Sequence, residues 1–275
     1  MIKLSLFVFP PFSFLGLRFL IASIAFIIFF YRRLHFPRRD ELIAGLLLGI
    51  LLFIGFASQI LGLVYTSASN SALITGVNIL IVPFAQYFII KKKVGLENWV
   101  GTLVVMAGLF LLTNPLNSDI NKGDLITVIC AVSWAFYIIY LDIYTKRFDL
   151  YNLVLIQFII VGIISVLIAM ITEQSSSMAF NSLSIFAIFY TAIPATLFAT
   201  FLLNKYQKET TPVRAALLIT FEQPSAVILA ILILKDRFYS LQIIGGIMMI
   251  CGILFSETFE YIKAEFSNIL IKKRR

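Results

Sequence analysis

Residues 212–236 read PVRAALLITFEQPSAVILAILILKD, a hydrophobic stretch with a carboxylate near its centre. About 20 residues of helix cross the hydrocarbon core of a bilayer, so Glu222 is expected near mid-depth, where a carboxylate is most costly. Pro224 has no backbone N–H, which predicts a kink in this helix and a free carbonyl near Thr220. An acid and a broken helix at one depth favour the wall of a binding site inside a membrane.

The composition of the whole chain excludes a soluble globular class. Of its 275 residues 60% are hydrophobic and 13% are charged, and the mean hydropathy is +0.98. These values indicate that lipid is the solvent for most of the chain. The net charge of +8 does not indicate a nucleic-acid partner, because the basic residues are dispersed in short loops and the tail. Two cysteines lie in apolar spans and the single histidine, His35, lies in a basic loop, so we expect no disulfide, no metal site and no cofactor.

Nine hydrophobic segments are long enough to cross a membrane as helices. They are 12–31, 42–64, 70–90, 97–113, 124–144, 151–172, 183–204, 213–234 and 239–257. Met1 to Phe9 is apolar but too short to span, and no small-residue cleavage site follows it. The sequence therefore predicts a multi-pass membrane protein without a soluble domain.

The loops between these segments differ in their content of Lys and Arg, which sets the orientation in a membrane. One set of loops holds Arg32, Arg33, Arg38, Arg39, Lys91, Lys92, Lys93, Lys146, Arg147, Lys205, Lys208, Arg214 and the basic tail. The opposite set holds only Lys122, Lys235 and Arg237. We therefore expect the C-terminus to be cytoplasmic, and we expect the plasma (inner) membrane of a bacterium as the location.

The two halves of the chain repeat a pattern at an offset of 139–144 residues. The matched pairs are Arg18 with Gln157, Tyr65 with Tyr206, Ser69 with Thr210, Pro83 with Pro224, Asn98 with Gln242, Gly101 with Gly245 and Gly108 with Gly252. Each glycine pair is seven residues apart in its half, which predicts close helix–helix contact. Five helices per half would insert the halves with opposite topology. The first-half counterpart of 124–144 would begin before Met1, so most of one helix is expected to be missing.

These features resemble the drug/metabolite transporter superfamily, specifically its EamA-type members with ten helices in two five-helix repeats. The resemblance rests on Pro11-Phe12 to Leu17-Arg18-Phe19, Tyr65 to Ser69, Pro83 and Pro224, and the Asn98-x-x-Gly101 and Gln242-x-x-Gly245 starts with Gly108 and Gly252. Asp236 occupies a usually acidic position, and Lys92 replaces the acid in the first half. The fold implied is an all-α integral membrane protein with two inverted repeats. Its parts are 1–113 (truncated at its start), 124–257, and a basic tail, 258–275.

The resemblance also implies a secondary transporter that moves small metabolites, often amino acids or their derivatives, and often outward. Alternating access would take place about a midplane cavity lined by the first, third, fourth, sixth, eighth and ninth helices of the ten-helix plan. The expected partners are a small-molecule substrate and the lipid bilayer, and a homodimer is left open. A membrane-embedded enzyme is an alternative, but it needs paired acids or a nucleophile with its base, so we expect no enzyme. Two further hypotheses are a channel and a non-transporting truncated homologue.

Two charged residues inside the predicted spans are the leading binding candidates. Glu222 could bind a proton or a cationic substrate group; the alternative is a hydrogen-bonded glutamate packed between helices. Arg18 could hold a substrate carboxylate; the alternative is a side chain that reaches lipid headgroups. Together the two charges suit a zwitterion.

Seven polar or amphipathic side chains are further binding candidates, each with interhelical hydrogen bonding or packing as the alternative. They are Gln59, Asn78, Ser133, Trp134, Tyr137, Thr196 and Thr200. Trp134 and Tyr137 are three residues apart and share a helix face, which predicts an aromatic wall. Pro83 and Pro224 hold matching places in the two halves, and we predict that they kink their helices at a gate.

Overall fold

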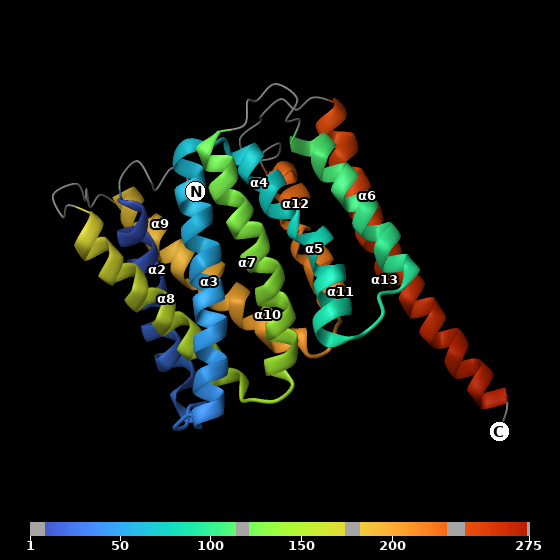
Figure 1. The fold of residues 1–275 in the computed structure, drawn as a ribbon, viewed down its shortest axis with the longest axis horizontal. Coiled ribbons are helices and arrows are strands. Elements are labelled where there is room, and N and C mark those ends of the chain that lie inside the picture. Colours follow the sequence, from blue (N-terminus) through green and yellow to red (C-terminus); the bar gives the residue numbers. More distant parts are fainter. Residues whose placement is uncertain (1–8, 114–120, 174–181, 230–239, 274–275) are drawn as a thin grey trace.

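The chain folds into a bundle of long helices that run side by side (Figure 1). The computed structural model describes residues 9–113, 121–173, 182–229 and 240–273, and within these ranges it contains no strand. The helices are α2 (Pro11–Phe30), α3 (Arg39–Tyr65), α4 (Ala68–Gly76), α5 (Asn78–Ala85), α6 (Leu96–Thr113), α7 (Lys122–Thr145), α8 (Leu150–Thr172), α9 (Ser182–Ala192), α10 (Ala199–Gln207), α11 (Pro212–Ile219), α12 (Glu222–Leu229) and α13 (Ser240–Lys273). A 3₁₀ turn (Tyr31–Arg33) follows α2, and π-helical turns follow α5 (Gln86–Ile90) and α9 (Ile193–Phe198).

Eight segments of the described residues are long and apolar enough to cross a membrane. They are Pro11–Arg33, Arg39–Tyr65, Ala68–Ile90, Leu96–Thr113, Lys122–Thr145, Leu150–Thr172, Ile185–Gln207 and Ser240–Phe259. These segments confirm eight of the predicted spans. The remaining one, 213–234, forms the two shorter helices α11 and α12, and its residues 230–234 lie outside the described part. The predicted remnant of a first helix falls on residues 1–8, which are also outside it.

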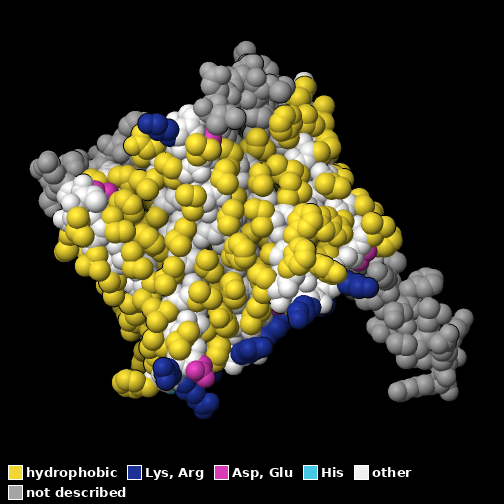
Figure 2. Space-filling view, viewed as in Figure 1, with side chains coloured by type: hydrophobic (Ala, Val, Ile, Leu, Met, Phe, Trp, Pro, Cys, Tyr) yellow, Lys and Arg dark blue, Asp and Glu magenta, His cyan; other side chains and the backbone are white. Residues whose placement is uncertain are grey.

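Apolar side chains cover the visible face of the bundle, and Lys and Arg gather along its lower edge (Figure 2). The connections at 31–38, 91–95, 146–149 and 208–211 lie toward this edge, which we call the basic end. Large apolar side chains such as Met170 and Ile171 are 77% and 83% exposed. A soluble protein rarely exposes so much apolar surface to water. This apolar face is therefore the lipid-facing surface of a membrane protein.

The most extensive helix contacts join α6 to α13, α3 to α7, α2 to α8 and α3 to α8. The offset between the sequence halves relates α2 to α8 and α6 to α13, so two of these pairs join equivalent helices. Equivalent elements meet each other when a two-fold axis passes between them. A pseudo-two-fold axis between the two halves is the arrangement expected for an inverted internal repeat.

The contact between α6 and α13 is reciprocal and very close. A Cβ on Gly108 would lie 2.6 Å from the Gly245 carbonyl oxygen, and one on Gly245 would lie 2.5 Å from the Gly108 carbonyl oxygen. Gly101 and Gly252 repeat the arrangement, with Cβ-to-oxygen distances of 3.0 and 3.1 Å. This confirms the predicted packing role of the four glycines.

Glu173, just after α8, holds the start of α2. Its carboxylate accepts hydrogen bonds from the Phe12 and Ser13 backbone N–H groups at 2.7 and 2.8 Å, and from the Ser13 hydroxyl at 2.7 Å. The first N–H groups of a helix have no partner within the helix and favour an anion. One side chain therefore caps α2 and ties it to its equivalent helix, α8.

The adjacent glycines of α13 offer a matched test of the α6 contact. Gly245→Ala should destabilise the fold by about 1–3 kcal/mol, because the new methyl group meets backbone atoms of α6. Gly246→Ala should be neutral or slightly stabilising, because a Cβ there meets nothing closer than 3.7 Å and alanine favours helix. Thermal unfolding of the detergent-purified variants measures both, and equal midpoints would contradict the close approach.

Candidate functional site

Arg18 is a cation buried within the membrane-spanning part of α2. It lies about 10 Å from the start of α2, at 1.5 Å rise per residue, and is 3% exposed. Its Nε donates a hydrogen bond to Thr196 Oγ1 at 2.5 Å, and its guanidinium carbon lies 4.9 Å from the Phe56 ring centroid. Its Nη1 is buried without a hydrogen-bond partner among the described residues. This burial leaves no surface for lipid headgroups, and the free donor can receive an anionic group.

The π-helical turn Ile193–Phe198 positions the partner of Arg18. Pro194 lies in this turn and cannot donate a backbone hydrogen bond. The Thr196 hydroxyl donates to the Thr191 carbonyl, five residues back, at 2.8 Å. It also accepts the bond from Arg18 Nε, so its donor and an acceptor lone pair are both used. The widened turn therefore fixes one edge of the guanidinium and leaves Nη1 free.

Glu222 is the first residue of α12, directly after a break in the helix. α11 ends at Ile219, and a tight turn at Thr220 and Phe221 separates it from α12. The start of a helix stabilises a carboxylate through its free N–H groups. The Glu222 side chain is exposed, and its charge and that of Arg18 attract each other through space. The two residues are not among the ion pairs within 4.0 Å in the described part of the chain, so their charged groups are separated.

The corresponding helix of the first half has a shorter interruption, a single residue whose backbone stays in the helical region. α4 ends at Gly76, Val77 follows, and α5 begins with Asn78. Asn78 is buried, and its side-chain oxygen Oδ1 has no hydrogen-bond partner in the described ranges. Each half therefore presents a polar side chain at the first residue of its second half-helix. Such half-helix starts commonly face bound groups inside membranes.

The helix break at Thr220 and Phe221 lies where Pro224 was expected to kink the chain, but no break lies at Pro83. Pro83 lies inside α5, which stays helical through it, and the interruption comes earlier at Val77. The predicted free carbonyl near Thr220 is wrong, because the Thr220 oxygen accepts a bond from the Gln223 N–H at 3.2 Å. A tighter 3₁₀-type turn replaces the donor that Pro224 lacks. The gate role of the two prolines stays a prediction.

A row of aromatic rings leads away from Arg18. Phe19 meets Phe56 at 5.3 Å between centroids, Phe56 meets Trp134 at 5.3 Å, and Trp134 meets Tyr137 at 5.5 Å, all edge to face. Trp134 is partly exposed, whereas Tyr137 is fully buried. Trp134 can therefore present a surface to a ligand, but Tyr137 supports it from behind.

The polar atoms of Tyr137 belong to a closed hydrogen-bond triangle. The Tyr137 hydroxyl donates to Gln157 Oε1 at 2.8 Å, Gln157 Nε2 donates to Asn204 Oδ1 at 3.1 Å, and Asn204 Nδ2 donates to the Tyr137 oxygen at 3.1 Å. All three residues are fully buried, and they join α7, α8 and α10. The triangle fastens three helices of the second half.

The remaining predicted binding residues lie in different surroundings. Ser133 is buried and donates to the Leu51 carbonyl at 2.6 Å, which joins α7 to α3. Thr200 is buried one turn before Asn204, and its carbonyl accepts a bond from Asn204 Nδ2 at 2.8 Å. Gln59 is half-buried on α3. The structure thus places Arg18 against Thr196 and Phe56, and Phe56 in turn contacts Trp134. The sequence analysis missed Phe56 because phenylalanine is so abundant in this chain.

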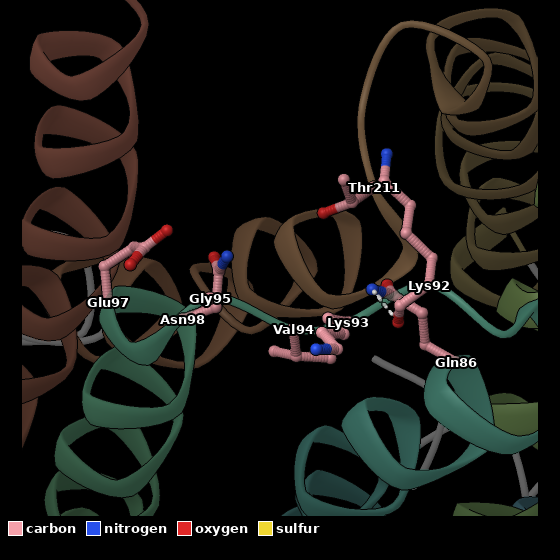
Figure 3. Close-up of a pocket in the computed structure, with 8 residues that line it drawn as sticks. All are labelled: Gln86, Lys92, Lys93, Val94, Gly95, Glu97, Asn98 and Thr211. Carbon is pink, nitrogen blue, oxygen red and sulfur yellow. Dashed lines mark hydrogen bonds between the residues drawn. The ribbon is translucent and has the colours of Figure 1, made fainter.

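The basic end contains a polar pocket of about 290 Å³ (Figure 3). It is lined by Gln86, Lys92, Lys93, Val94, Gly95, Glu97, Asn98 and Thr211. Lys92 extends toward Thr211 in Figure 3, so the pocket brings a first-half connection close to a second-half connection. Gln86 Oε1 is buried there without a partner among the described residues, while its Nε2 donates to the Lys92 carbonyl at 3.5 Å. The pocket offers a polar opening between the halves.

Comparison with protein families identifies one match along both halves. The EamA-like transporter family matches residues 1–114 and 121–258. An "Uncharacterized transporter" of Archaeoglobus fulgidus is 25% identical over 253 residues, which is 92% of this chain and 79% of that protein. The "S-adenosylmethionine uptake transporter" of Rickettsia prowazekii is 27% identical over 138 residues, which is 48% of this chain and 46% of that protein.

A solved structure supports the fold. One crystal structure superimposes on this chain with a TM-score of 0.79, over 92% of this chain and 90% of its own. Its sequence identity is 16%, so the likeness concerns the fold alone.

Substitution of Tyr137 separates a structural role from a binding role. Tyr137→Phe should destabilise the protein by about 1–2 kcal/mol, because Gln157 Oε1 loses its donor and Asn204 Nδ2 loses an acceptor. Tyr140→Phe, on a partly buried ring of the same helix, should leave the unfolding midpoint nearly unchanged. Thermal unfolding in detergent gives the comparison. A normal midpoint for Tyr137→Phe would show that the triangle adds no stability.

Proposed function

Because the chain belongs to the EamA-like transporter family, we propose that it is a secondary active transporter that exports small zwitterionic metabolites, amino acids or related compounds. Transport would proceed by alternating access about a midplane site between the repeats 1–113 and 124–257. The C-terminus would lie in the cytoplasm, by the positive-inside rule. A transporter rather than an enzyme is what the family and its relatives indicate.

One observation carries the substrate class: a buried Arg18 and an exposed Glu222 with opposite charges and no direct contact. An amino acid has a carboxylate for the free Nη1 of Arg18 and an ammonium group for Glu222. Hydrogen bonds between charged groups are about twice as strong as neutral ones, and more so away from water. A zwitterion would satisfy both protein charges at once, whereas a simple anion or cation would leave one without a partner.

The aromatic row extends the proposed site beyond the amino-acid group. Phe56 is buried under the Arg18 guanidinium and contacts Trp134, whose partly exposed ring can offer a face to an apolar or cationic side group. The Rickettsia relative is named for S-adenosylmethionine, which has an amino-acid zwitterion, a sulfonium cation and a purine ring. This compound therefore joins the amino acids as a candidate substrate. The relative is named an uptake transporter, so the proposed export must be measured against transport in the inward direction.

The described residues suggest the driving force as well. Glu222 is the carboxylate expected nearest mid-depth, and it begins a half-helix where alternating access would change its surroundings. We propose that it releases and binds a proton as the carrier alternates. The basic-end pocket would serve as the cytoplasmic entrance, because it lies between connections of the two halves.

Arg18→Lys tests whether Arg18 binds the carboxylate of the substrate. Lysine keeps the charge but loses the planar fork that bonds Thr196 and presents Nη1. Counterflow of labelled amino acids into inside-out vesicles should show KM raised by about 10–100-fold, the equivalent of one charged hydrogen bond. Arg33→Lys, in the exposed turn after α2, is the matched control and should transport normally. Unchanged KM for Arg18→Lys would remove Arg18 from the site.

Glu222→Gln tests proton coupling. Glutamine has nearly the same shape but cannot release a proton at any accessible pH, so a pH gradient should no longer drive uptake into inside-out vesicles. Counterflow without a gradient should persist at a reduced rate. If the gradient still accelerates uptake by the variant, Glu222 is not the coupling group.

A further inference from the structure

A second cluster of charged side chains lies at the basic end, away from the site around Arg18. His35 follows α2, Glu41 lies in the first turn of α3, and Asp149 precedes α8. One possible ligand atom from each residue lies within 4.8 Å of the others. They line a cavity of about 320 Å³ together with Arg38, Asp40, Arg147 and Phe148.

Glu41 is the most unusual member of this cluster. The residue is 3% exposed, and its Oε2 accepts bonds from the Arg38 N–H at 3.2 Å and from Asn152 Nδ2 at 3.3 Å. Its second oxygen, Oε1, is buried without a partner among the described residues. A buried carboxylate oxygen without a donor is unfavourable, so this atom requires a further positive or donating group.

His35 supplies the imidazole of the cluster. Its Nδ1 lies 3.2 Å from the Phe36 carbonyl oxygen, and its Nε2 lies 4.0 Å from Asp149 Oδ1. The side-chain nitrogen of Asn152 lies 3.0 Å from Nδ1 and 3.3 Å from Nε2, so a metal ion on Nε2 would take the place of that second contact. A backbone carbonyl on the second ring nitrogen is the common support of a metal-bound imidazole.

Asp149 completes the set from the other half of the chain. Its Oδ1 accepts bonds from the Tyr151 and Asn152 N–H groups at 2.9 and 3.2 Å and so caps α8. The cap uses one oxygen and holds the carboxylate rigidly beside His35 and Glu41. These bonds explain the position of Asp149 but not the buried oxygen of Glu41.

We propose that His35, Glu41 and Asp149 bind a divalent transition-metal ion of the zinc class. One imidazole nitrogen and two carboxylate oxygens are suitable ligands for such an ion, at about 2.0–2.2 Å, with water in a fourth position. The cavity lining holds three carboxylates, Asp40, Glu41 and Asp149, against two arginines, so its charge favours a cation. The ion would join the start of α3 to the start of α8, which pack against each other.

Cobalt(II) provides a direct test, because its visible absorption reports coordination by nitrogen and oxygen. The full chain, purified in detergent with a tag that contains no histidine, should develop this absorption on titration, and Zn²⁺ should displace it. His35 is the only histidine of the chain, so a nitrogen ligand is assigned without ambiguity. His35→Gln and Glu41→Gln should each weaken binding by about 10-fold or more.

Asp40→Asn is the matched control, since it removes a carboxylate from the same cavity but not from the ligand set. It should bind Co²⁺ within about threefold of the parent protein, as expected for a screened surface charge. Unfolding midpoints without metal verify that each variant folds, and Zn²⁺ should raise the midpoint only where the three ligands are present. No metal-dependent absorption, or equal binding by His35→Gln, would overturn the proposal.

Discussion

The fold depends on one constraint: inside a bilayer, every backbone polar group must find its partner within the protein. Long helices meet this requirement, and most of the described chain consists of them. The departures within the spans include the breaks before Asn78 and Glu222 and the π-helical turns that contain Gln86 and Thr196. Polar side chains occur at all four, so irregular backbone and polar chemistry are concentrated in the same elements. The other long helices, including the close pair α6 and α13, are continuous α-helices over their described length.

The burial of Arg18 is a cost that the surrounding elements only partly offset. Thr196 satisfies Nε, two phenylalanine faces cover the guanidinium, and Glu222 supplies an opposite charge at a distance. A fully paired arginine would need further acceptors at Nη1, which has none among the described residues. Replacing a buried ion pair by apolar residues is often neutral or stabilising, so a buried arginine with an unpaired donor is better explained by binding than by stability.

Hydrophobicity and glycine spacing were sufficient to predict eight of the spans and the close contact of α6 with α13, because lipid imposes segment length directly. The partners of the polar side chains were not predictable. Arg18 and Thr196 are 178 residues apart, and Tyr137, a predicted wall residue, is buried in a triangle with Gln157 and Asn204. Such pairings depend on helix rotation and on long-range packing, which a pattern of apolar residues does not specify. The predicted free carbonyl near Thr220 failed for a local reason, since a tighter turn gives this oxygen the Gln223 N–H as a donor.

The two halves match the same family but differ in their chemistry. Arg18 and Gln157 hold equivalent places in α2 and α8, yet the first has a free donor and a distant charge, while the second bonds to the neutral groups of Tyr137 and Asn204. Asn78 and Glu222 each begin the second half-helix of their half, one neutral and the other charged, although the pairing of Pro83 with Pro224 does not match them residue for residue. In a carrier with inverted repeats, the inward-open and outward-open states arise when the halves exchange conformations. Unequal groups at equivalent positions make those states unequal in free energy for a charged ligand. The affinity would then differ on the two sides of the membrane, although the gradients would still set the net direction of transport.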